Sequence, residues 1–404
     1  MAAHREHTTD SPAQDPISEV MEIQMGPSHP ATHGTIKFDL VLDGETIVDC
    51  QTEVGYLHRG FEKMCEQGTW TQCIPYTDRL NYASPLINNF IFTEAVERLL
   101  GVKVPERCSY IRVILSESSR IADHLTCLGM AAAEMGAITV GFYMNEAREL
   151  LYNLNQAVTG ARLTVSYGRV GGLARDLPEG FAEQISAAVA KIRATLDDCE
   201  KLLERNRIFI DRMAGIGVIT AEDAVSYGLT GPLLRATGVR RDLRKDDPYM
   251  LYDRFEFEVP VGTKGDNFDR FSVRFEETRQ SLRIIEQALA SLPGGPVSID
   301  DPTIVLPAKQ EVYENIEGLM SHFKLVIEGI KVPVGEIYFA GEGANGELGF
   351  FIVSDGSGRP YRVRVRPPCF YGMGAVARMV RGYAVADLVT IFGMVNMIGG
   401  ECDR

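Results

Sequence analysis

Apolar residues recur at every second position along residues 35–42 (TIKFDLVL), at Ile36, Phe38, Leu40 and Leu42. A period of two places the apolar side chains on one face of a β-strand. Asp43-Gly44 follows, and this pair is typical of tight hairpin turns. We therefore expect a return strand over about 46–57, so that the N-terminal region forms a β-hairpin.

From Phe61 the apolar spacing becomes helical, with repeats at three and four positions. Gly101 and Gly160 each follow such a segment and are candidates for helix C-caps. The stretch 215–266, between the predicted helices 180–214 and 267–291, is rich in Gly, Pro, Asp and Arg. It is too long for a connector without a role, so we expect it to be packed and functional. The predicted long helices cover residues 85–100, 105–128, 143–159, 180–214, 267–291 and 372–394.

From Phe323 the pattern again favours strands, and residues 346–354 and 360–366 form a hairpin candidate around SDGSGR. The chain shows no βαβ alternation and no GxGxxG, which argues against a dinucleotide-binding fold. It also contains no P-loop, HExxH or GxSxG motif. The expected fold class is α+β, a central helical bundle flanked by small antiparallel β regions.

The expected organisation is a disordered polar tail over residues 1–18, followed by a single domain over residues 19–404. The tail has no apolar core and is not a signal peptide. We divide the domain into four parts: an N-terminal hairpin region (19–60), a helical bundle (61–322) that contains the insert 215–266, a β region (323–370), and a C-terminal helix and tail (371–404).

Residues 125–144 test whether the chain enters a membrane, because they hold only one charge, Glu134, in twenty residues. Glycines and threonines dilute the hydrophobicity, and a central carboxylate is costly in lipid. We expect this segment to be a buried helix and the chain to have no transmembrane helix.

Composition narrows the function. Of the 404 residues 45% are hydrophobic, which is enough for a large core, and the formal charge of −14 argues against nucleic-acid binding. The eight cysteines form no CxxC pair, so we expect buried, reduced thiols and neither a zinc nor an iron–sulfur site built from this chain alone.

The segment GPSHPATHG (26–34) places His29 and His33 four residues apart, but Pro30 prevents a helix there. The two histidines must therefore lie on a turn or loop, which the following hairpin holds in place. Taken alone, the segment is equally compatible with a surface turn whose histidines are incidental, since loops often carry function but most do not.

Seven ordered blocks carry a resemblance to a known family: GPSHPATHG, EVGYLHRGFEKM, YTDRLNY, VTGARLT, GLTGPLLRATGVRRDLRKDDPYMLYDRFEFEVPVGTKGDNFDRF, GELGFFIVSDGSGRPYRVRVRPP and the ending GECDR. Over about residues 20–404 the chain resembles the D subunit of proton-translocating NADH-quinone oxidoreductase, respiratory complex I. It looks like the separate D subunit and not a fusion with the C subunit.

The resemblance implies a peripheral-arm component at the cytoplasmic face of the bacterial inner membrane. It would contact the B, C and H subunits, and with the B subunit, which carries the terminal [4Fe–4S] cluster, it would form the quinone-reduction site. Quinone would be the substrate, NADH would be oxidised on a distant subunit, and this chain would bind no cofactor of its own. The family is related to the large subunit of [NiFe] hydrogenases, but the two CxxC motifs are absent, so the metal site would be lost.

The resemblance also implies roles for single residues. His33 and Tyr82 look like the pair that gives protons to the quinone, and His29 would tune His33. Glu134 stands where the family usually has Asp and would relay the proton, and Arg79 resembles the family arginine close to the cluster. Taken alone, Tyr82 would be a packing residue and Arg79 a surface ion-pair partner.

Two charged runs remain open to more than one interpretation. We expect RRDLRKDD (240–247) to form buried or interface ion pairs, and the alternating arginines of YRVRVR (361–366) to share one strand face suited to an acidic partner. The rival functions are a pure scaffold, and a component of a related membrane complex fed by ferredoxin or F420.

Overall fold

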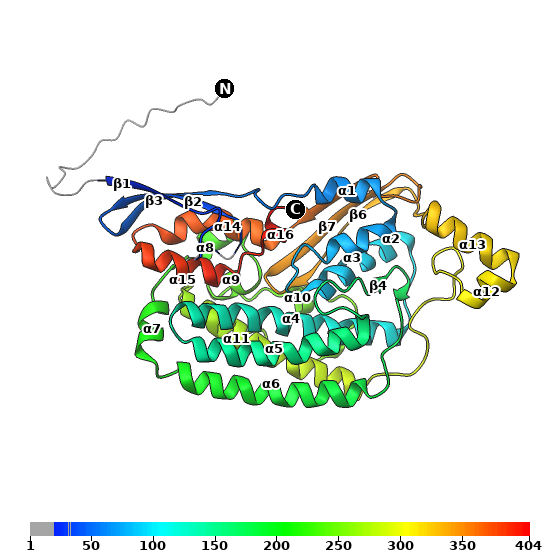
Figure 1. The fold of residues 1–404 in the computed structure, drawn as a ribbon, viewed down its shortest axis with the longest axis horizontal. Helices are drawn as coiled ribbons and strands as arrows, with labels where there is room; N and C mark the ends of the chain where they lie inside the picture. The colour runs from blue at the N-terminus through cyan, green and yellow to red at the C-terminus, as the bar shows by residue number, and fades with distance from the viewer. Residues whose placement is uncertain (1–19, 31, 33) are drawn as a thin grey trace, which may run out of the picture.

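The structure is a computed structural model that describes residues 20–30, 32 and 34–404. A layer of long helices forms one side of an elongated body, and two small sheets lie along the other side, with the C-terminus between them (Figure 1). The predicted tail over residues 1–18 lies outside the described residues. The α+β class with flanking antiparallel sheets is confirmed.

The N-terminal sheet consists of β1 (Val20–Met25), β2 (Lys37–Asp43) and β3 (Thr46–Glu53), antiparallel and in that order. The predicted hairpin is β2–β3, and β1 adds a strand that we did not expect. The apolar face of β2 is buried, and the Phe38 ring meets Phe392 edge-on at 5.3 Å. The sheet therefore packs on the C-terminal helices and forms a second, smaller core with them.

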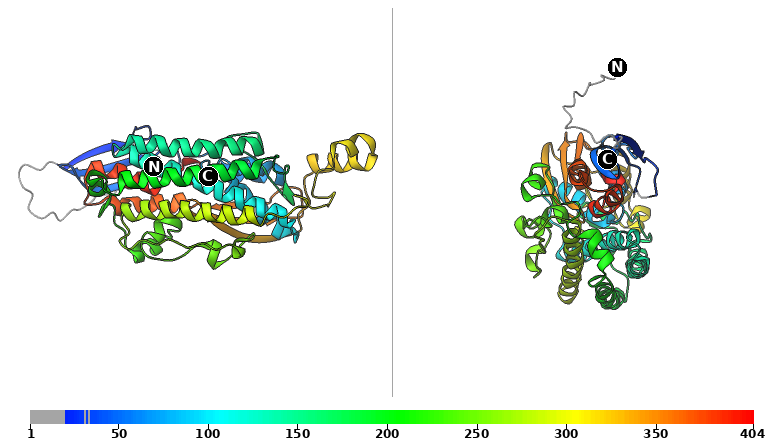
Figure 2. Two further views of the ribbon diagram at one scale, coloured as in Figure 1. Left: turned by 90° about the horizontal axis from the view of Figure 1, so that it is seen from below. Right: turned by 90° about the vertical axis from the view of Figure 1, so that its left-hand side faces the viewer.

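The helical layer is built around α4 (Glu106–Glu134), which contacts α3, α5, α11 and α15 and is buried along most of its length. Gly101 ends α3 in the left-handed conformation, at φ 72°, as its C-cap position predicts. The view from below in Figure 2 shows the long helices side by side. They are α5 (Ile138–Thr159), α6 (Phe181–Leu203) and α11 (Asn267–Ala290), whereas α3 (Pro85–Leu100) packs against α4.

Short elements connect these helices. One of them, α7, divides the helix predicted over 180–214 into two, because Asn206 begins a new helix by accepting a hydrogen bond from Phe209 N. The short elements are α1 (Phe61–Gln67), α2 (Trp70–Thr77), β4 (Gly168–Arg169), β5 (Gly172–Leu173), α7 (Arg207–Met213), α8 (Ala221–Ser226), α9 (Gly231–Arg235), α10 (Leu243–Asp246) and the 3₁₀ turn η1 (Tyr252–Arg254).

The C-terminal sheet contains β6 (Gly335–Gly343), β7 (Gly346–Ser354) and β8 (Arg362–Arg366), and α3 packs against it. The hairpin expected over 346–366 is confirmed as β7–β8. Arg362 and Arg364 are exposed and Arg366 is half-buried, while the valines between them are buried, so the arginines do share one face.

The strand expected from Phe323 is wrong. Phe323 lies within α13 (Ile316–Ile327), which pairs with α12 (Lys309–Glu314) in a hairpin that projects from the body (Figure 1). Apolar residues of α13 recur at helical spacing, and this outweighs the β-branched pair Val326-Ile327.

The predicted final helix is also two helices, α14 (Pro368–Val380) and α15 (Val385–Val395), followed by α16 (Gly399–Cys402). The break falls at Gly382, whose φ of 83° suits glycine. The chain then turns at Asn396, which is left-handed at φ 55°, a conformation that Asn tolerates better than most residues. These turns return the C-terminus to the middle of the molecule.

Residues 125–144 are not one helix. They comprise the end of α4, a turn at 135–137 and the start of α5, in which Ile138 and Phe142 are exposed. Of the helices within the described ranges, none combines the length and apolar character needed to span a bilayer.

Candidate functional site

Tyr82 lies in a turn between α2 and α3, here called the tyrosine turn (residues 78–84). The side-chain amide of Asn88 donates to the carbonyl oxygens of Thr77 (3.1 Å) and Asn81 (2.9 Å). These bonds brace the turn from α3, and Pro85 starts that helix where a missing N–H costs nothing. The Tyr82 side chain remains 36% exposed, so it faces outward from a rigid support.

A buried carboxylate lies directly behind this turn. Asp123, on α4, is fully buried, and its Oδ2 accepts hydrogen bonds from Asn81 Nδ2 at 2.7 Å and from Ser84 Oγ at 2.9 Å. Its other oxygen, Oδ1, accepts a bond from Asn396 Nδ2 at 2.9 Å. One side chain therefore holds the turn on both sides of Tyr82 and ties it to the end of α15.

The surroundings of Tyr82 keep its phenol protonated. Partial burial raises its pKa above the ordinary value, and the Cys369 thiol and the Asp123 carboxylate raise it further, while Arg59 acts in the opposite direction. A phenol with a raised pKa holds its proton until a strongly basic acceptor forms beside it. Tyr82 therefore carries its proton at neutral pH, and its role as a proton donor stays a prediction.

Arg79 occupies the same turn with its side chain exposed. Its Nη1 donates to Pro75 O at 2.5 Å, and it lies 3.8 Å from the buried Asp78 carboxylate. Burial raises the pKa of Asp78 to about 6, and bonds from Ser166 N and Asn89, together with the Arg79 charge, limit that rise. Arg79 thus adds a positive charge to the surface beside Tyr82.

The C-terminal segment (residues 396–404) packs against the back of the tyrosine turn. A Cβ on Gly400 would come within 2.3 Å of Arg79 O, so only glycine permits this approach. Asp403 accepts hydrogen bonds from the backbone N–H groups of Gly55 (2.9 Å) and Leu57 (2.8 Å). The segment therefore clamps the β3–α1 loop and the tyrosine turn together.

The loop that joins β1 to β2 carries the two predicted histidines. His29 is exposed and its carbonyl oxygen accepts bonds from Thr32 N (3.0 Å) and Thr32 Oγ1 (2.9 Å). A Cβ on Gly34 would lie 3.1 Å from the Met397 side chain, which places this part of the loop against the C-terminal segment. His33 itself lies outside the described residues, so its role stays a prediction.

Glu134 is the last residue of α4 and is partly buried. A Cβ on Gly393 would lie 2.7 Å from Glu134 Oε2, so the glycine makes room for the carboxylate against α15. The carboxylate oxygen Oε2 is buried, while the residue as a whole is partly exposed where α4 ends. Coupling between Glu134 and His33 stays a prediction.

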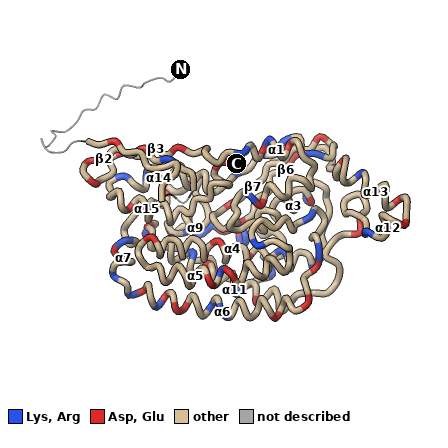
Figure 3. The backbone as a smooth tube through the Cα atoms, in the orientation of Figure 1, with Lys and Arg blue, Asp and Glu red and all other residues tan. Residues whose placement is uncertain are grey.

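A cluster of buried ionic side chains joins α4 to the insert 215–266. Arg244 Nη1 bonds Glu117 Oε2 at 3.1 Å, and its Nη2 bonds Asp242 Oδ2 at 2.6 Å. Buried ion pairs were expected in RRDLRKDD, and this is confirmed for Asp242 and Arg244, while the other charged residues of the run are exposed. Figure 3 shows charged positions at the centre of the molecule around α4 as well as along its outside.

The same cluster contains His124, beside Asp123. Its Nε2 lies 2.9 Å from Glu277 Oε2, and Arg235 also bonds Glu277, at 2.7 Å. Burial lowers the pKa of His124, and the hydrogen bond and charge of Glu277 act in the opposite direction. Burial works against ionisation of Glu277, but the Arg235 charge and the hydrogen bond with His124 lower its pKa to about 2.

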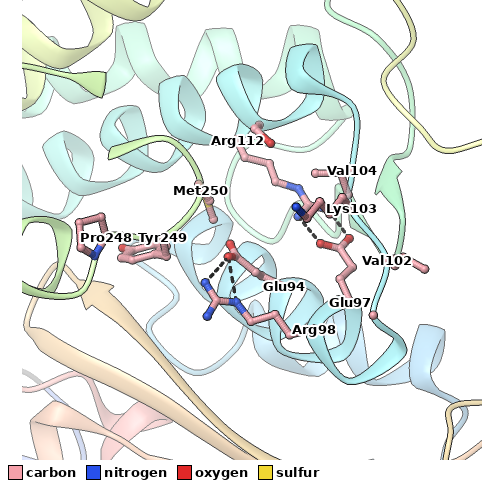
Figure 4. Close-up of a pocket in the computed structure, with 12 residues that line it drawn as sticks. Glu94, Glu97, Arg98, Val102, Lys103, Val104, Arg112, Pro248, Tyr249 and Met250 are labelled. Atoms are coloured by element: carbon pink, nitrogen blue, oxygen red, sulfur yellow. Dashed lines mark hydrogen bonds and ion pairs between the residues drawn. The ribbon is translucent and has the colours of Figure 1, made fainter. Parts of the chain in front are cut away.

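A cavity of about 540 Å³ lies at the far end of α3, away from Tyr82. Its carboxylates already have partners: Arg98 Nη2 bonds Glu94 Oε1 at 2.9 Å, and Arg112 bonds Glu97 at 2.6 and 2.7 Å (Figure 4). Tyr82 and Glu94 are separated mainly by the first turns of α3, which corresponds to roughly 15 Å. This cavity is therefore separate from the candidate site.

All eight cysteines are buried, as expected. Within the described ranges, no three side chains of His, Cys, Asp or Glu converge in a way that would hold a metal ion. Cys73 donates to Cys65 O at 3.3 Å, and Cys402 lies on α16.

Sequence reasoning missed Asp123, Asn396 and Glu401, which lie behind Tyr82. Glu401 is fully buried, and burial raises its pKa to about 7, with the Asp123 charge adding to the rise while Cys369 and Arg366 lower it. The available signals were a carboxylate within a predicted helix, in SSRIADHLT, and the ending GECDR. Neither pattern predicts which residues these side chains contact in the folded chain.

The comparisons define the class of protein. The family model for the 49 kDa subunit of respiratory-chain NADH dehydrogenase matches residues 134–404, which is more than half of the chain. The chain belongs to this family. Its described fold, with the glycine-rich C-terminal segment packed on the tyrosine turn, is thus that of a component of a respiratory oxidoreductase.

Full-length relatives specify which component it is. The first of the NADH-quinone oxidoreductase D subunits of Sorangium cellulosum is 56% identical over 396 residues, covering 98% of both chains. The D subunit of Myxococcus xanthus is also 56% identical, over 95% of this chain and 92% of the relative. A C/D subunit of Bdellovibrio bacteriovorus is 50% identical over 99% of this chain, which spans 72% of that relative. The chain is a D subunit of NADH-quinone oxidoreductase, complex I, and acts as a component of that enzyme together with its other subunits.

Proposed function

We propose that this chain, together with the B subunit of the same complex, forms the site at which quinone is reduced. The observation that carries the proposal is Tyr82: a phenol with a raised pKa on a braced turn, still 36% exposed in the chain by itself. Proton donation to a reduced quinone needs a site that excludes water. A second subunit that covers the tyrosine turn would complete such a site.

The chemistry assigned to the site balances. A quinone becomes a quinol when it takes up two electrons and two protons, one proton on each carbonyl oxygen. Electrons arrive from the terminal [4Fe–4S] cluster on the B subunit, and the Tyr82 phenol and the imidazolium of His33 each supply one proton. Arg79, on the exposed side of the turn, adds positive charge that favours electron arrival at a nearby cluster.

The proposal includes a route for proton resupply and a place for the chain in the complex. Glu134 and His29 relay protons to His33, and the proton movement is coupled to translocation by the membrane arm. The chain also contacts the C and H subunits and lies at the cytoplasmic face of the inner membrane, held there by its partners. Exposed apolar residues at the α4–α5 turn support such contacts: Met130, Ile138, Phe142 and Tyr143. The fold is proposed to be that of a [NiFe]-hydrogenase large subunit whose metal site has been lost.

The substitution Tyr82→Phe tests the proposal, because it removes the phenol hydroxyl and keeps the ring. We expect NADH-dependent quinone reduction by the assembled complex to fall by roughly 100-fold, the range of one general acid. Reduction of a water-soluble artificial acceptor by NADH, which bypasses the quinone site, should not change. Tyr227→Phe is the matched control, since Tyr227 is 40% exposed and lies at the end of α8, outside the tyrosine turn. Normal quinone turnover in Tyr82→Phe would assign the chain a scaffold role instead.

A further inference from the structure

The tyrosine turn is held by a carboxylate that has no counter-charge. Asp123 is fully buried in α4, and among the residues described in the structure no Lys, Arg or His forms an ion pair with it. Its three partners are all neutral hydrogen-bond donors: Asn81, Ser84 and Asn396. A buried charge without a cationic partner is costly, and a neutral polar residue of similar size would avoid that cost. Its placement therefore calls for a role other than stability.

The arrangement of the three bonds indicates that role. Asn81 and Ser84 bracket Tyr82 in sequence, and both donate to the same oxygen, Oδ2. Asn81 also accepts a bond from Ala83 N at 3.1 Å through its own side-chain oxygen. The backbone on each side of Tyr82 is thus attached to one rigid point on the central helix. A phenol on this turn has little freedom to move relative to α4.

The third bond extends the link to the C-terminal segment. Asn396 Nδ2 reaches Asp123 Oδ1 at 2.9 Å and also Asn345 Oδ1 at 2.7 Å, while Asn345 Nδ2 lies 3.6 Å from Cys369 Sγ. Asn396 is left-handed, a conformation that only Gly, Asn and Asp adopt at low cost. The segment that clamps the β3–α1 loop is therefore attached to the same carboxylate as the tyrosine turn.

We propose that Asp123 is a positioning residue for quinone reduction: it fixes the Tyr82 phenol and joins the tyrosine turn to the C-terminal segment. This inference rests on the proposed function, in which Tyr82 gives a proton to the quinone. Asp123 acts on Tyr82 in two ways. It holds the turn by hydrogen bonds, and its negative charge favours the protonated phenol.

The charged and titratable groups around Tyr82 and Asp123 determine the size of this charge effect. Tyr82 is faced by Asp123 from α4, by Cys369 from α14 and by Arg59 from the β3–α1 loop. The titratable groups that respond to the Asp123 charge are Tyr82, His124, Cys127, Tyr152 and Glu401. Removing this charge should lower the pKa of Tyr82. The alkaline limb of the pH–rate profile for quinone reduction should therefore shift to lower pH.

The test compares three variants in the assembled complex. Asp123→Asn keeps the side-chain shape, but it removes the charge and replaces one of the two acceptor oxygens by an NH2 donor. We expect kcat for quinone reduction to fall by roughly 10-fold to 100-fold, since small misplacements of a reacting group have effects of that size. The quinone KM should change less than kcat, and the alkaline limb should move to lower pH.

The double variant Asp123→Asn/Asn396→Asp exchanges the two groups across the 2.9 Å bond. Asp tolerates the left-handed conformation at 396, and the Asn345 amide, whose Oδ1 accepts from Asn396 in the wild type, has to turn so that its Nδ2 donates to the new carboxylate. A carboxylate is then returned to the network, so we expect recovery of most of the lost kcat and of the alkaline limb. The position of the alkaline limb is the readout that a role limited to general stability would not move. Thr278→Val is the matched control, because it removes one buried side-chain bond of 2.8 Å on α11, away from the turn, and quinone kcat should stay normal.

If Asp123→Asn does not assemble, Ser84→Ala removes one bond to the carboxylate and leaves the charge, so kcat should fall with an unchanged alkaline limb. A kcat within twofold of the wild type in Asp123→Asn, or in Ser84→Ala if Asp123→Asn does not assemble, overturns the inference, as does a double variant no better than Asp123→Asn. Tyr82→Phe separates the two levels of the argument. An inactive Tyr82→Phe with a normal Asp123→Asn rejects the positioning role alone, whereas an active Tyr82→Phe rejects the proposed function.

Discussion

Glu401 provides a stability prediction whose size follows from its surroundings. The carboxyl group is fully buried on α16, and its pKa of about 7 compares with an ordinary value of 4.5. When the C-terminal segment opens to solvent, Glu401 returns to its ordinary pKa. The difference corresponds to about 3 kcal/mol of opening free energy, or a few hundred-fold in the opening equilibrium.

The sign follows from proton binding. Between pH 4.5 and about 7 the closed segment binds more protons than the open one, so its protection falls as pH rises through this window. The penalty is absent below pH 4.5 and complete above about 7. Glu401→Gln keeps the shape of the side chain but has no charge to desolvate. The variant should therefore be better protected than the wild type at pH 8 and similar to it near pH 5.

Hydrogen exchange of the assembled complex, read by mass spectrometry on peptides covering residues 396–404, measures this difference. Comparing the variant and the wild type at the same pH cancels the intrinsic exchange rate. Glu336→Gln, at an exposed carboxylate on β6, is the control and should show no pH-dependent difference. Equal protection of the wild type and Glu401→Gln at every pH from 5 to 8 would refute the reasoning.

Three further predictions concern the buried charges, the relay and metal content. Arg244→Met removes the cation that bonds both of the buried carboxylates Glu117 and Asp242, and it should destabilise the chain by about 3–5 kcal/mol. Arg241→Met, at a surface pair with Glu347, should cost about 1 kcal/mol or less. Thermal unfolding measures both losses, and equal losses would contradict the cluster's importance. Glu134→Gln should lower quinone turnover and proton pumping between pH 6 and 8, and wild-type values for both would make the carboxylate structural. Elemental analysis of the purified chain should find no stoichiometric iron or nickel. Stoichiometric amounts of either metal would contradict this expectation.

Sequence reasoning succeeded where one physical signal dominated a segment. The period of two in TIKFDLVL and the following Asp-Gly located the β2–β3 hairpin, and glycine caps located the ends of α3 and α5. It failed at α13, where β-branched residues within FKLVIEG outweighed the helical spacing of the longer segment. It also merged α14 with α15, which a turn at Gly382 separates.

The candidate site was predictable only in part for a similar reason. Tyr82 and Arg79 were found through the ordered motifs, and the structure brings them together on one turn. Asp123 is far in the sequence from Asn396 and Glu401, and it becomes their neighbour only because the chain reverses at Asn396 and Gly400 permits close packing. Spacing along a chain carries no information about such contacts, so tertiary structure was needed to find them.

A structure of the assembled complex with a quinone bound gives the most direct measurement of the central claim, the distance from Tyr82 Oη to the nearest quinone carbonyl oxygen. Our account predicts about 2.6–3.2 Å, the range of a hydrogen bond able to transfer a proton. A quinone whose carbonyl oxygens both bond to other groups, with Tyr82 Oη out of reach of the headgroup, would contradict it.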